Sequence, residues 1–282
     1  MQCTGPAQGV PYAAYAVPGA EGFVPDGLPP ANPAYVPTVP PPVPGAVPGP
    51  PVLECRGLAK RYSGGGAWAL SGCDLVVPPG RIVGLIGPNG SGKTTLIKLA
   101  AGLLQPTAGS ILVCGFEPGP ESKARVSYLP ERPYFAPSMR VSDALALFQD
   151  FYADFDRVLA GDMLARLGVP LGSPFSALSK GTKEKVQLSL VMARRASLYL
   201  LDEPIAGVDP AARDYILETI FKAYRREATI IVSTHLVADI ERVLDDFILL
   251  QYGTVLLHST PETVREQTGL SLDEYFRGLY RC

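Results

Sequence analysis

The chain has 282 residues, and its 25 Lys and Arg side chains nearly balance its 27 Asp and Glu side chains, for a formal net charge of −2. This balance argues against a protein that binds nucleic acid over its whole surface, because such binding requires a strongly basic face. Hydrophobic residues make up 47% of the chain, which is enough to bury a large core.

Residues 1–51 differ in composition from the rest of the chain. They contain 15 of the 29 prolines and only two charged side chains, Glu21 and Asp26. A segment rich in Pro, Ala and Gly cannot form regular backbone hydrogen bonds and has no apolar period to bury. We therefore predict a disordered tail over 1–51, which is either a docking arm or a dispensable extension, before a folded domain over 52–282.

Three features favour a cytoplasmic location. The N-terminus lacks the basic and apolar regions of a signal peptide, and no run of 18 or more apolar residues could form a transmembrane helix. The five cysteines are scattered without a CxxC pair: Cys3, Cys55, Cys73, Cys114 and Cys282. We expect free thiols in a reducing compartment rather than disulfides or a zinc site.

From residue 52 onward, short apolar runs alternate with helical patterns. Strands are expected at 82–86, 198–201, 229–232 and 247–250, and helices at 94–101, 211–226 and 236–244. This alternation predicts an α/β fold with a mainly parallel sheet and helices on both faces. Apolar residues at helical spacing over 141–155 indicate mostly core positions and predict a helical subdomain over about 132–195. A C-terminal helical tail is expected over about 260–282.

A glycine-rich segment follows the first of these strands and opens a helix. It reads Gly87-Pro88-Asn89-Gly90-Ser91-Gly92-Lys93-Thr94, followed by Thr95, and it matches the phosphate-binding pattern G-x-x-x-x-G-K-[ST]. Glycines allow successive backbone N–H groups to point at phosphate oxygens, and the helix N-terminus adds positive potential. We predict that Lys93 contacts the β- and γ-phosphates and that the Thr94 hydroxyl binds Mg²⁺.

A second apolar run, residues 198–201, ends in two acids, Asp202 and Glu203. Because side chains alternate along a strand, the two carboxylates point in different directions. We assign Asp202 to the metal ion and Glu203 to polarising the attacking water. Without the phosphate loop, these acids would be equally well explained as the solvated end of a strand.

Further motifs in the same order resemble the nucleotide-binding subunit of ABC transporters. They are Leu178-Ser179-Lys180-Gly181-Thr182, then Asp202-Glu203-Pro204, then Ser233-Thr234-His235. The resemblance covers about residues 52–258, and within the family it is greatest for single-domain subunits of bacterial multidrug and antibiotic exporters. It implies a P-loop NTPase fold with a small antiparallel β part, a head-to-tail dimer, and hydrolysis of ATP with Mg²⁺.

The resemblance also implies roles for individual residues. Tyr62 would stack on the adenine ring, although an ordinary tyrosine at a strand end fits the sequence too. Ser179 and Gly181 would bind the γ-phosphate of ATP held by a second subunit. His235 would contact the γ-phosphate within its own subunit. Asp209 would lie in a loop that crosses the dimer interface, and a helix N-cap is an equally compatible role for it.

Two positions depart from the usual pattern of the family. Glu131 stands where the family usually has Gln; a carboxylate can still bind Mg²⁺ directly or through water, but it adds negative charge beside ATP. Lys180-Gly181-Thr182 stands where Gly-Gly-Gln is usual. Lys180 either adds a cation near the opposing nucleotide or faces solvent.

We therefore expect an ATPase subunit, in a homodimer or heterodimer, that energises a separately encoded membrane permease on the inner face of the cell membrane. Export of a drug, peptide or lipid-like substrate is expected, and no nucleic-acid partner. Tyr134 and Phe135 would either contact that permease or pack inside the helical subdomain. The alternative is a soluble ABC-type ATPase acting in translation or DNA maintenance. A binding module without catalysis is disfavoured by Lys93, Asp202 and Glu203.

Overall fold

The computed structural model describes residues 49–63, 66–206, 210–223, 225 and 227–280. Most of the predicted tail and Asp209 lie outside the described residues, so the predictions for them stay predictions. No helix in the described part of the chain combines the length and the apolar character that crossing a bilayer requires.

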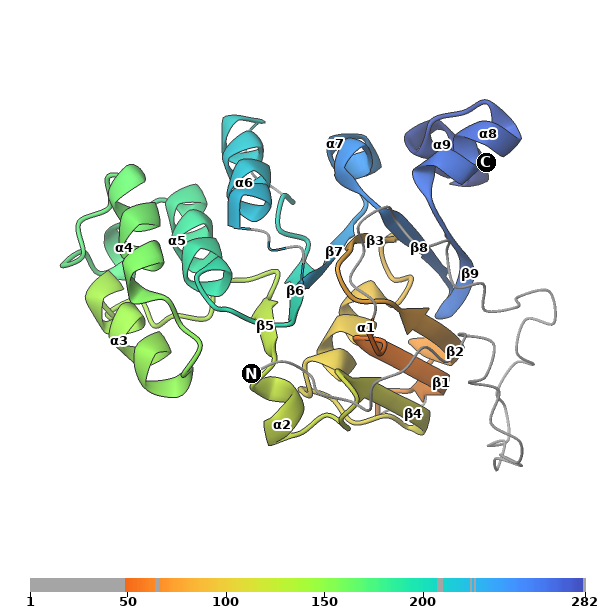
Figure 1. Cartoon of the computed structure of the whole chain (residues 1–282), viewed down its shortest axis with the longest axis horizontal. Coiled ribbons are helices and arrows are strands. Elements are labelled where there is room, and N and C mark those ends of the chain that lie inside the picture. Colours follow the sequence, from red (N-terminus) through yellow and green to blue (C-terminus); the bar gives the residue numbers. More distant parts are fainter. Residues whose placement is uncertain (1–48, 64–65, 207–209, 224, 226, 281–282) are drawn as a thin grey trace.

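Two sheets lie at the centre of the described structure (Figure 1). The smaller sheet is antiparallel in the order β2-β1-β4, and the larger has the order β5-β6-β7-β3-β8-β9 and is parallel except for β9. The strands are β1 (Leu53–Lys60), β2 (Leu70–Val77), β3 (Ile82–Ile86), β4 (Ala108–Val113), β5 (Val126–Leu129), β6 (Leu198–Asp202), β7 (Thr229–Thr234), β8 (Asp246–Gln251) and β9 (Thr254–Ser259).

The helices cover both faces of the larger sheet. They are α1 (Lys93–Ala100), α2 (Pro120–Lys123), α3 (Val141–Phe151), α4 (Arg157–Arg166), α5 (Lys180–Met192), α6 (Pro210–Ala223), α7 (Val237–Ile240), α8 (Pro261–Thr268) and α9 (Leu272–Tyr280), with the 3₁₀ turns η2 (Phe175–Ala177) and η3 (Glu241–Val243). The predicted α/β class with a mainly parallel sheet and a small antiparallel sheet is confirmed. The helix expected at 236–244 is shorter, because α7 passes into a 3₁₀ turn at Glu241.

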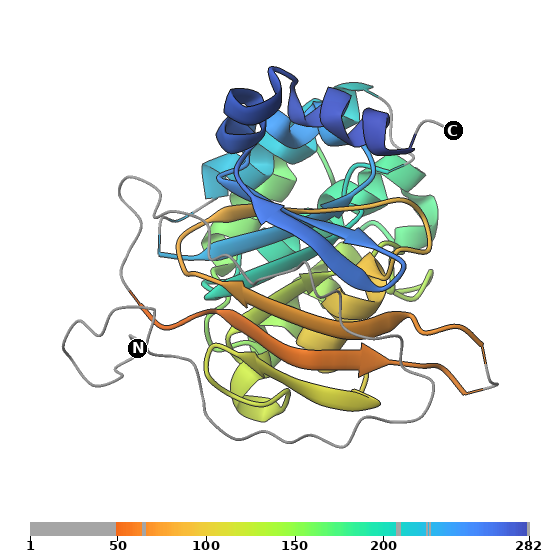
Figure 2. The same cartoon turned by 90° about the vertical axis from the view of Figure 1, so that its right-hand side faces the viewer.

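Alternating side chains of the central strands pack into two separate hydrophobic cores. In β7, Ile231 belongs to the core shared with α1 and the antiparallel sheet, whereas Ile230 and Val232 belong to the core on the opposite face. Val264 of α8 and Leu272 of α9 also belong to this second core. Figure 2 shows these C-terminal helices above the larger sheet, with the antiparallel sheet on the other side. The sheet is therefore buried on both faces, as its continuous apolar strands predict.

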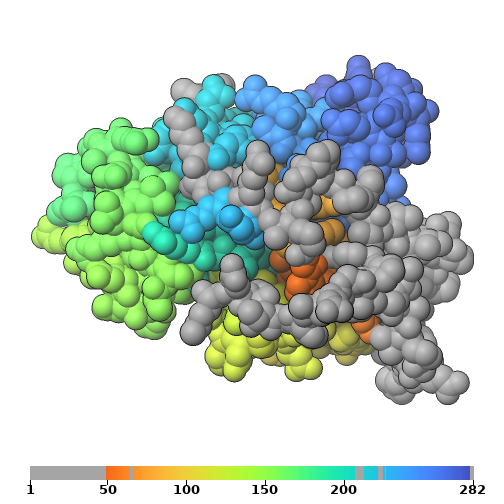
Figure 3. All heavy atoms as spheres, in the orientation of Figure 1, coloured from red at the N-terminus to blue at the C-terminus, as the bar shows by residue number. Residues whose placement is uncertain are grey.

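Helices α3, α4 and α5 form a third core at one end of the molecule (Figures 1 and 3). Phe148 of α3 is buried in it, as the sequence pattern predicted. Phe151 is an exception to the mostly core positions expected over 141–155, because this last residue of α3 is 75% exposed. The rings of Tyr152 and Phe155 take the space against Phe148 instead, with centroids 5.3 and 5.5 Å away.

Candidate nucleotide-binding site

The phosphate-binding sequence forms the turn between β3 and α1. Every residue of β3 is buried, so its apolar run ends abruptly at the sheet edge, where the loop begins. Gly92 has φ 108°, and a Cβ there would lie 2.5 Å from the carbonyl oxygen of Ala69. A Cβ on Gly87 would lie 2.2 Å from the carbonyl oxygen of Leu250. Both positions therefore require glycine for reasons of space, and Gly92 also for its left-handed backbone.

Lys93 begins α1 and is only 5% exposed. Its Nζ donates hydrogen bonds to the carbonyl oxygens of Gly87 (2.7 Å) and Pro88 (3.2 Å). The same Nζ lies 3.5 Å from Oε1 of Glu203. Burial lowers the pKa of Lys93 from its ordinary value, and the carboxylate of Glu203 opposes that shift. The loop therefore holds this cation at its centre by its own carbonyl groups and by an acid from another strand.

Asp202, at the end of β6, is 1% exposed and accepts two hydroxyl hydrogen bonds on one oxygen. Its Oδ1 accepts from Ser233 Oγ at 2.7 Å and from Thr94 Oγ1 at 3.0 Å. Its Oδ2 is buried and makes no hydrogen bond to any described residue. Burial raises the pKa of Asp202; the bonds from Ser233 and Thr94 oppose that rise, and the carboxylates of Glu131 and Glu203 add to it.

These residues fit a magnesium ion. A buried carboxylate oxygen without a partner, beside a threonine hydroxyl, is a suitable ligand pair for Mg²⁺, which binds few protein oxygens together with phosphates. Within the described ranges, no group of three or more His, Cys, Asp or Glu side chains could hold a metal alone. Thr94 and Asp202 would therefore share the ion with the phosphates of a nucleotide, and Glu131 stays a predicted ligand.

Glu203 has a left-handed backbone with φ 50°, which costs a non-glycine residue about 1 kcal/mol. Its N–H donates to both the Oγ (2.9 Å) and the carbonyl oxygen (3.1 Å) of Ser233. Its Oε2 lies 3.0 Å from Nδ1 of His235, opposite the contact of Oε1 with Lys93. Strain of this kind is typical of functional sites, where the surrounding contacts maintain it.

A cavity of about 520 Å³ lies beside Lys93, Thr94, Glu203 and His235. Its lining contains the sequence-predicted residues Asn89, Gly90, Ser91, Gly92, Lys93, Thr94, Thr95, Glu131, Glu203 and His235, together with Ala69 and Ala206. Segments that are far apart in sequence therefore meet at the carboxyl ends of β3, β6 and β7, which is where α/β sheets bind ligands.

Six of the predicted site residues in the described ranges are not part of this lining. Three of them bond to lining residues: Gly87 and Pro88 accept hydrogen bonds from Lys93, and Asp202 accepts one from Thr94.

The other three are Tyr62, Ser179 and Gly181. Tyr62 is 48% exposed, and its hydroxyl lies 3.2 Å from Oγ1 of Thr95, at the rim of the site. Ser179 is the N-cap of α5, where its Oγ accepts a hydrogen bond from the N–H of Thr182, and Gly181 follows in the first turn. The structure therefore does not bring Ser179 and Gly181 to the nucleotide cavity of their own chain.

The Ser233 side chain, which bonds to Asp202 and to the backbone of Glu203, has no role predicted from the sequence. The feature of the sequence that could have indicated such a role is a polar residue near the end of the apolar strand Thr229–Thr234. Its pairing with Asp202 became visible only in the register of β6 with β7.

Comparison with known proteins identifies the family of this chain. The sequence profile described as "ABC transporter" matches residues 70–206. The ABC-type transporter ATP-binding protein EcsA of Bacillus subtilis is 33% identical over 223 residues, which cover 73% of this chain and 88% of that protein. This chain belongs to the ABC transporter family. It is an ATP-binding subunit of that family and an ATPase.

Other similar proteins support the assignment of this ABC ATPase to the family. The Nod factor export ATP-binding protein I of Burkholderia orbicola is 31% identical over 223 residues, covering 76% of this chain and 72% of that protein. A solved ATP-binding subunit of an ABC transporter is 34% identical, with a TM-score of 0.73 over 82% of this chain and 100% of that one. A dimeric ATP-binding cassette solved with ADP and Pi has a TM-score of 0.66 at 19% identity, and this likeness shows the fold alone.

Proposed function

We propose that this ABC ATPase hydrolyses ATP at the cavity between β3, β6 and β7 and thereby energises a separate membrane permease. The observation that carries the proposal is the position of the Glu203 carboxylate between Lys93 and His235. A carboxylate held on both sides is oriented for one water molecule, and phosphoryl transfer depends mainly on such positioning and on charge neutralisation.

Each group has a distinct part in this reaction. Lys93 binds the terminal phosphates, Glu203 polarises the water for in-line attack, and His235 orients Glu203 and contacts the γ-phosphate. Mg²⁺, when bound by Thr94 and Asp202, neutralises charge on the phosphate oxygens. Replacing Glu203 by Gln keeps the shape and removes the charge, so hydrolysis should fall by about 10²–10⁴-fold. Hydrolysis at the parental rate would contradict this assignment.

The complete site is proposed to need a second subunit. Ser179 and Gly181 lie at the N-terminus of α5, outside the cavity of their own chain, in a position that can face a neighbouring nucleotide. A helix N-terminus with a hydroxyl group suits a phosphate. A homodimer, or a pair with a relative, would place these residues on the γ-phosphate held by the other subunit.

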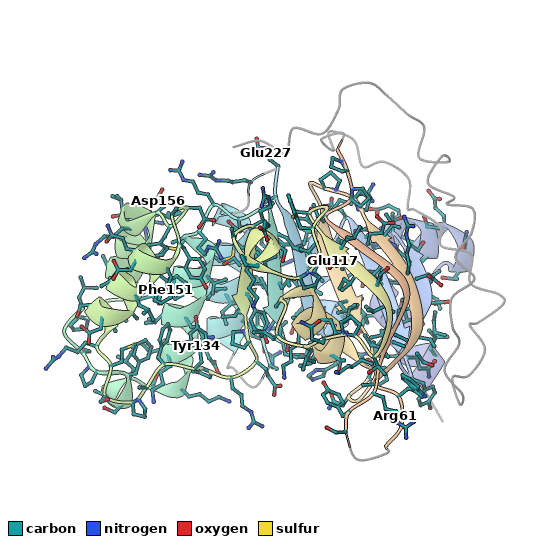
Figure 4. All side chains as sticks on the ribbon, turned by 90° about the horizontal axis from the view of Figure 1, so that it is seen from below. Arg61, Glu117, Tyr134, Phe151, Asp156 and Glu227 are labelled. Atoms are coloured by element: carbon teal, nitrogen blue, oxygen red, sulfur yellow. The ribbon has the colours of Figure 1, made fainter. Side chains whose placement is uncertain are left out.

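A groove between the sheet and the helical end supports a permease as the partner. It measures about 520 Å³, and its lining includes the aromatic rings of Tyr128, Tyr134, Phe148 and Tyr152. Tyr134 is 51% exposed (Figure 4). Its ring lies beside that of Phe135, which packs on Phe175 with ring centroids 4.6 Å apart. An exposed aromatic side chain in a groove is a typical anchor for a partner helix. We assign the groove to a cytoplasmic segment of the permease, with Phe135 packed inside the helical subdomain.

Export is the proposed direction of transport. The name of the Burkholderia relative contains the word export, and that relative covers three quarters of this chain. A drug, a peptide or a lipid-like compound is the proposed class of substrate, and the inner face of the cell membrane is the proposed location. Reconstitution of the chain with its permease in vesicles would test the direction, and ATP-dependent accumulation on the side that carries the ATPase would contradict it.

A further inference from the structure

The hydroxyl of Ser233 connects the two acids at the end of β6. It donates to Oδ1 of Asp202 at 2.7 Å and accepts from the backbone N–H of Glu203 at 2.9 Å. Both bonds have ordinary lengths and lie in a fully buried position, since Ser233 is 0% exposed. Ser233 pairs directly with Asp202 in the parallel register of β6 and β7, so backbone geometry places this hydroxyl beside both residues.

The bond to Asp202 determines which carboxylate oxygen is available. With the bond from Thr94, it gives Oδ1 two donors, whereas Oδ2 has no partner among the described residues. An outer hydrogen bond of this kind orients a carboxylate ligand and holds one oxygen toward the metal. Removal of the Ser233 hydroxyl would leave Thr94 as the donor to Oδ1 and would free the carboxylate to rotate.

The bond to Glu203 acts on the backbone rather than the carboxylate. Glu203 has φ 50°, a conformation that side-chain-bearing residues avoid unless neighbouring contacts hold it. The Ser233 hydroxyl and carbonyl oxygens both accept its N–H. This pair of acceptors fixes the turn that directs the Glu203 carboxylate toward Lys93 and His235.

We propose that Ser233 is a positioning residue for ATP hydrolysis, because its hydroxyl couples the orientation of Asp202 to the backbone turn at Glu203. The inference rests on the proposed roles of these two acids. Ser233 does not touch the substrate, and it acts through the two residues that do. Its loss should therefore impair turnover and the response to Mg²⁺ more than the binding of ATP.

The experiment measures the ATPase rate of the full chain against the concentrations of ATP and Mg²⁺, with the melting temperature of each variant. Ser233→Ala should lower kcat by about 10- to 100-fold and raise the Mg²⁺ concentration for half-maximal rate several-fold, while KM for ATP changes less than about threefold. Ser233→Thr keeps the hydroxyl and should restore kcat to within about threefold of the parental value.

Ser122→Ala is the matched control. Ser122 is 1% exposed, and its hydroxyl likewise accepts from a backbone N–H, that of Gly119 at 2.9 Å, and donates to an oxygen, the carbonyl of Gly119 at 3.0 Å. It lies on α2, outside the nucleotide cavity. Its replacement should affect the melting temperature as Ser233→Ala does and leave kcat unchanged.

Parental kcat and Mg²⁺ dependence in Ser233→Ala would overturn the proposal. So would a folded Ser233→Thr protein as impaired as Ser233→Ala. If Ser233→Ala does not fold, Ser233→Cys replaces it, because the thiol is similar in size and a weaker hydrogen-bonding group. Glu203→Gln in the same assay distinguishes failure of the proposed function from failure of this inference. A parental rate in Glu203→Gln would contradict the proposed function. An inactive Glu203→Gln together with a fully active Ser233→Ala would contradict only the role of Ser233.

Discussion

The ammonium group of Lys93 lies 3.5 Å from Oε1 of Glu203, so the residue that begins α1 and the residue that follows β6 form an ion pair inside the cavity. Both side chains are nearly buried, and their opposite charges offset each other. Nδ1 of His235 lies within hydrogen-bonding distance of the second carboxylate oxygen of Glu203. A phosphate oxygen bound in the cavity would therefore compete with the Glu203 carboxylate for the same cation.

Glu203→Gln should trap a dimer. The change removes the negative charge beside Lys93, so ATP binding should survive while hydrolysis is lost, and the retained ATP should hold two subunits together. We expect size-exclusion chromatography with Mg·ATP to show a dimer for Glu203→Gln, with the natural partner chain present if the subunits pair with a relative.

Two changes at Ser179 test the shared site in the Glu203→Gln background. Ser179→Arg adds bulk, and Ser179→Asp keeps an N-cap for α5 while adding a charge that repels phosphate. Each should return the protein to a monomer without abolishing ATP binding. A dimer that persists in both variants would contradict the proposed contact with the opposing nucleotide.

Lys93→Ala should weaken ATP binding by about 10- to 100-fold, because a charged donor to phosphate contributes roughly 1.5–3 kcal/mol. Isothermal titration with ATP gives the affinity directly. Arg277→Ala, which removes an exposed positive charge on α9, should leave the affinity unchanged. Equal affinities for Lys93→Ala and the parental chain would remove the phosphate-loop assignment.

Tyr134→Asp should reduce attachment to the membrane. A charge in place of the exposed ring would disrupt an aromatic anchor, and a loss of roughly 1.4 kcal/mol corresponds to about tenfold weaker docking. The full chain, expressed in its source cells, would be measured in membrane and supernatant fractions, with ATPase activity as a check on folding. Tyr252→Asp is the control, because Tyr252 is 83% exposed at the turn between β8 and β9, at the other edge of the sheet. Equal membrane fractions for both variants would contradict the assignment of the groove.

Asp246→Ala should destabilise the fold by about 3 kcal/mol, because it leaves the buried charge of Arg81 without this carboxylate. Asp246 Oδ2 lies 3.1 Å from Nη1 of Arg81 and 3.1 Å from Nε2 of His258, and all three residues are almost fully buried. Urea denaturation would measure the change. Asp273→Ala, which breaks an exposed pair with Arg277, should cost less than about 1 kcal/mol. Similar losses in both variants would show that the buried pair adds little.

The sequence alone determined the class of fold and the chemistry of the phosphate loop. Apolar runs that end at a glycine loop or at paired acids mark buried parallel strands, because only continuous apolar residues can be covered on both faces. The loop could be recognised because Gly87, Gly92, Lys93 and Thr94 stand at the set spacing of a phosphate-binding loop. These are local properties, so a short stretch of sequence contains them.

Tertiary structure decided which distant groups meet. The pairing of Asp202 with Ser233 and the placement of Glu203 between Lys93 and His235 depend on strand order and register. These bring β3, β6 and β7 together although long segments of chain separate them. Phe151 fits the apolar spacing of the helix over 141–155 but is exposed, and the rings of Tyr152 and Phe155 pack against Phe148. Long-range packing sets such contacts, because it selects among arrangements that the local sequence permits equally well.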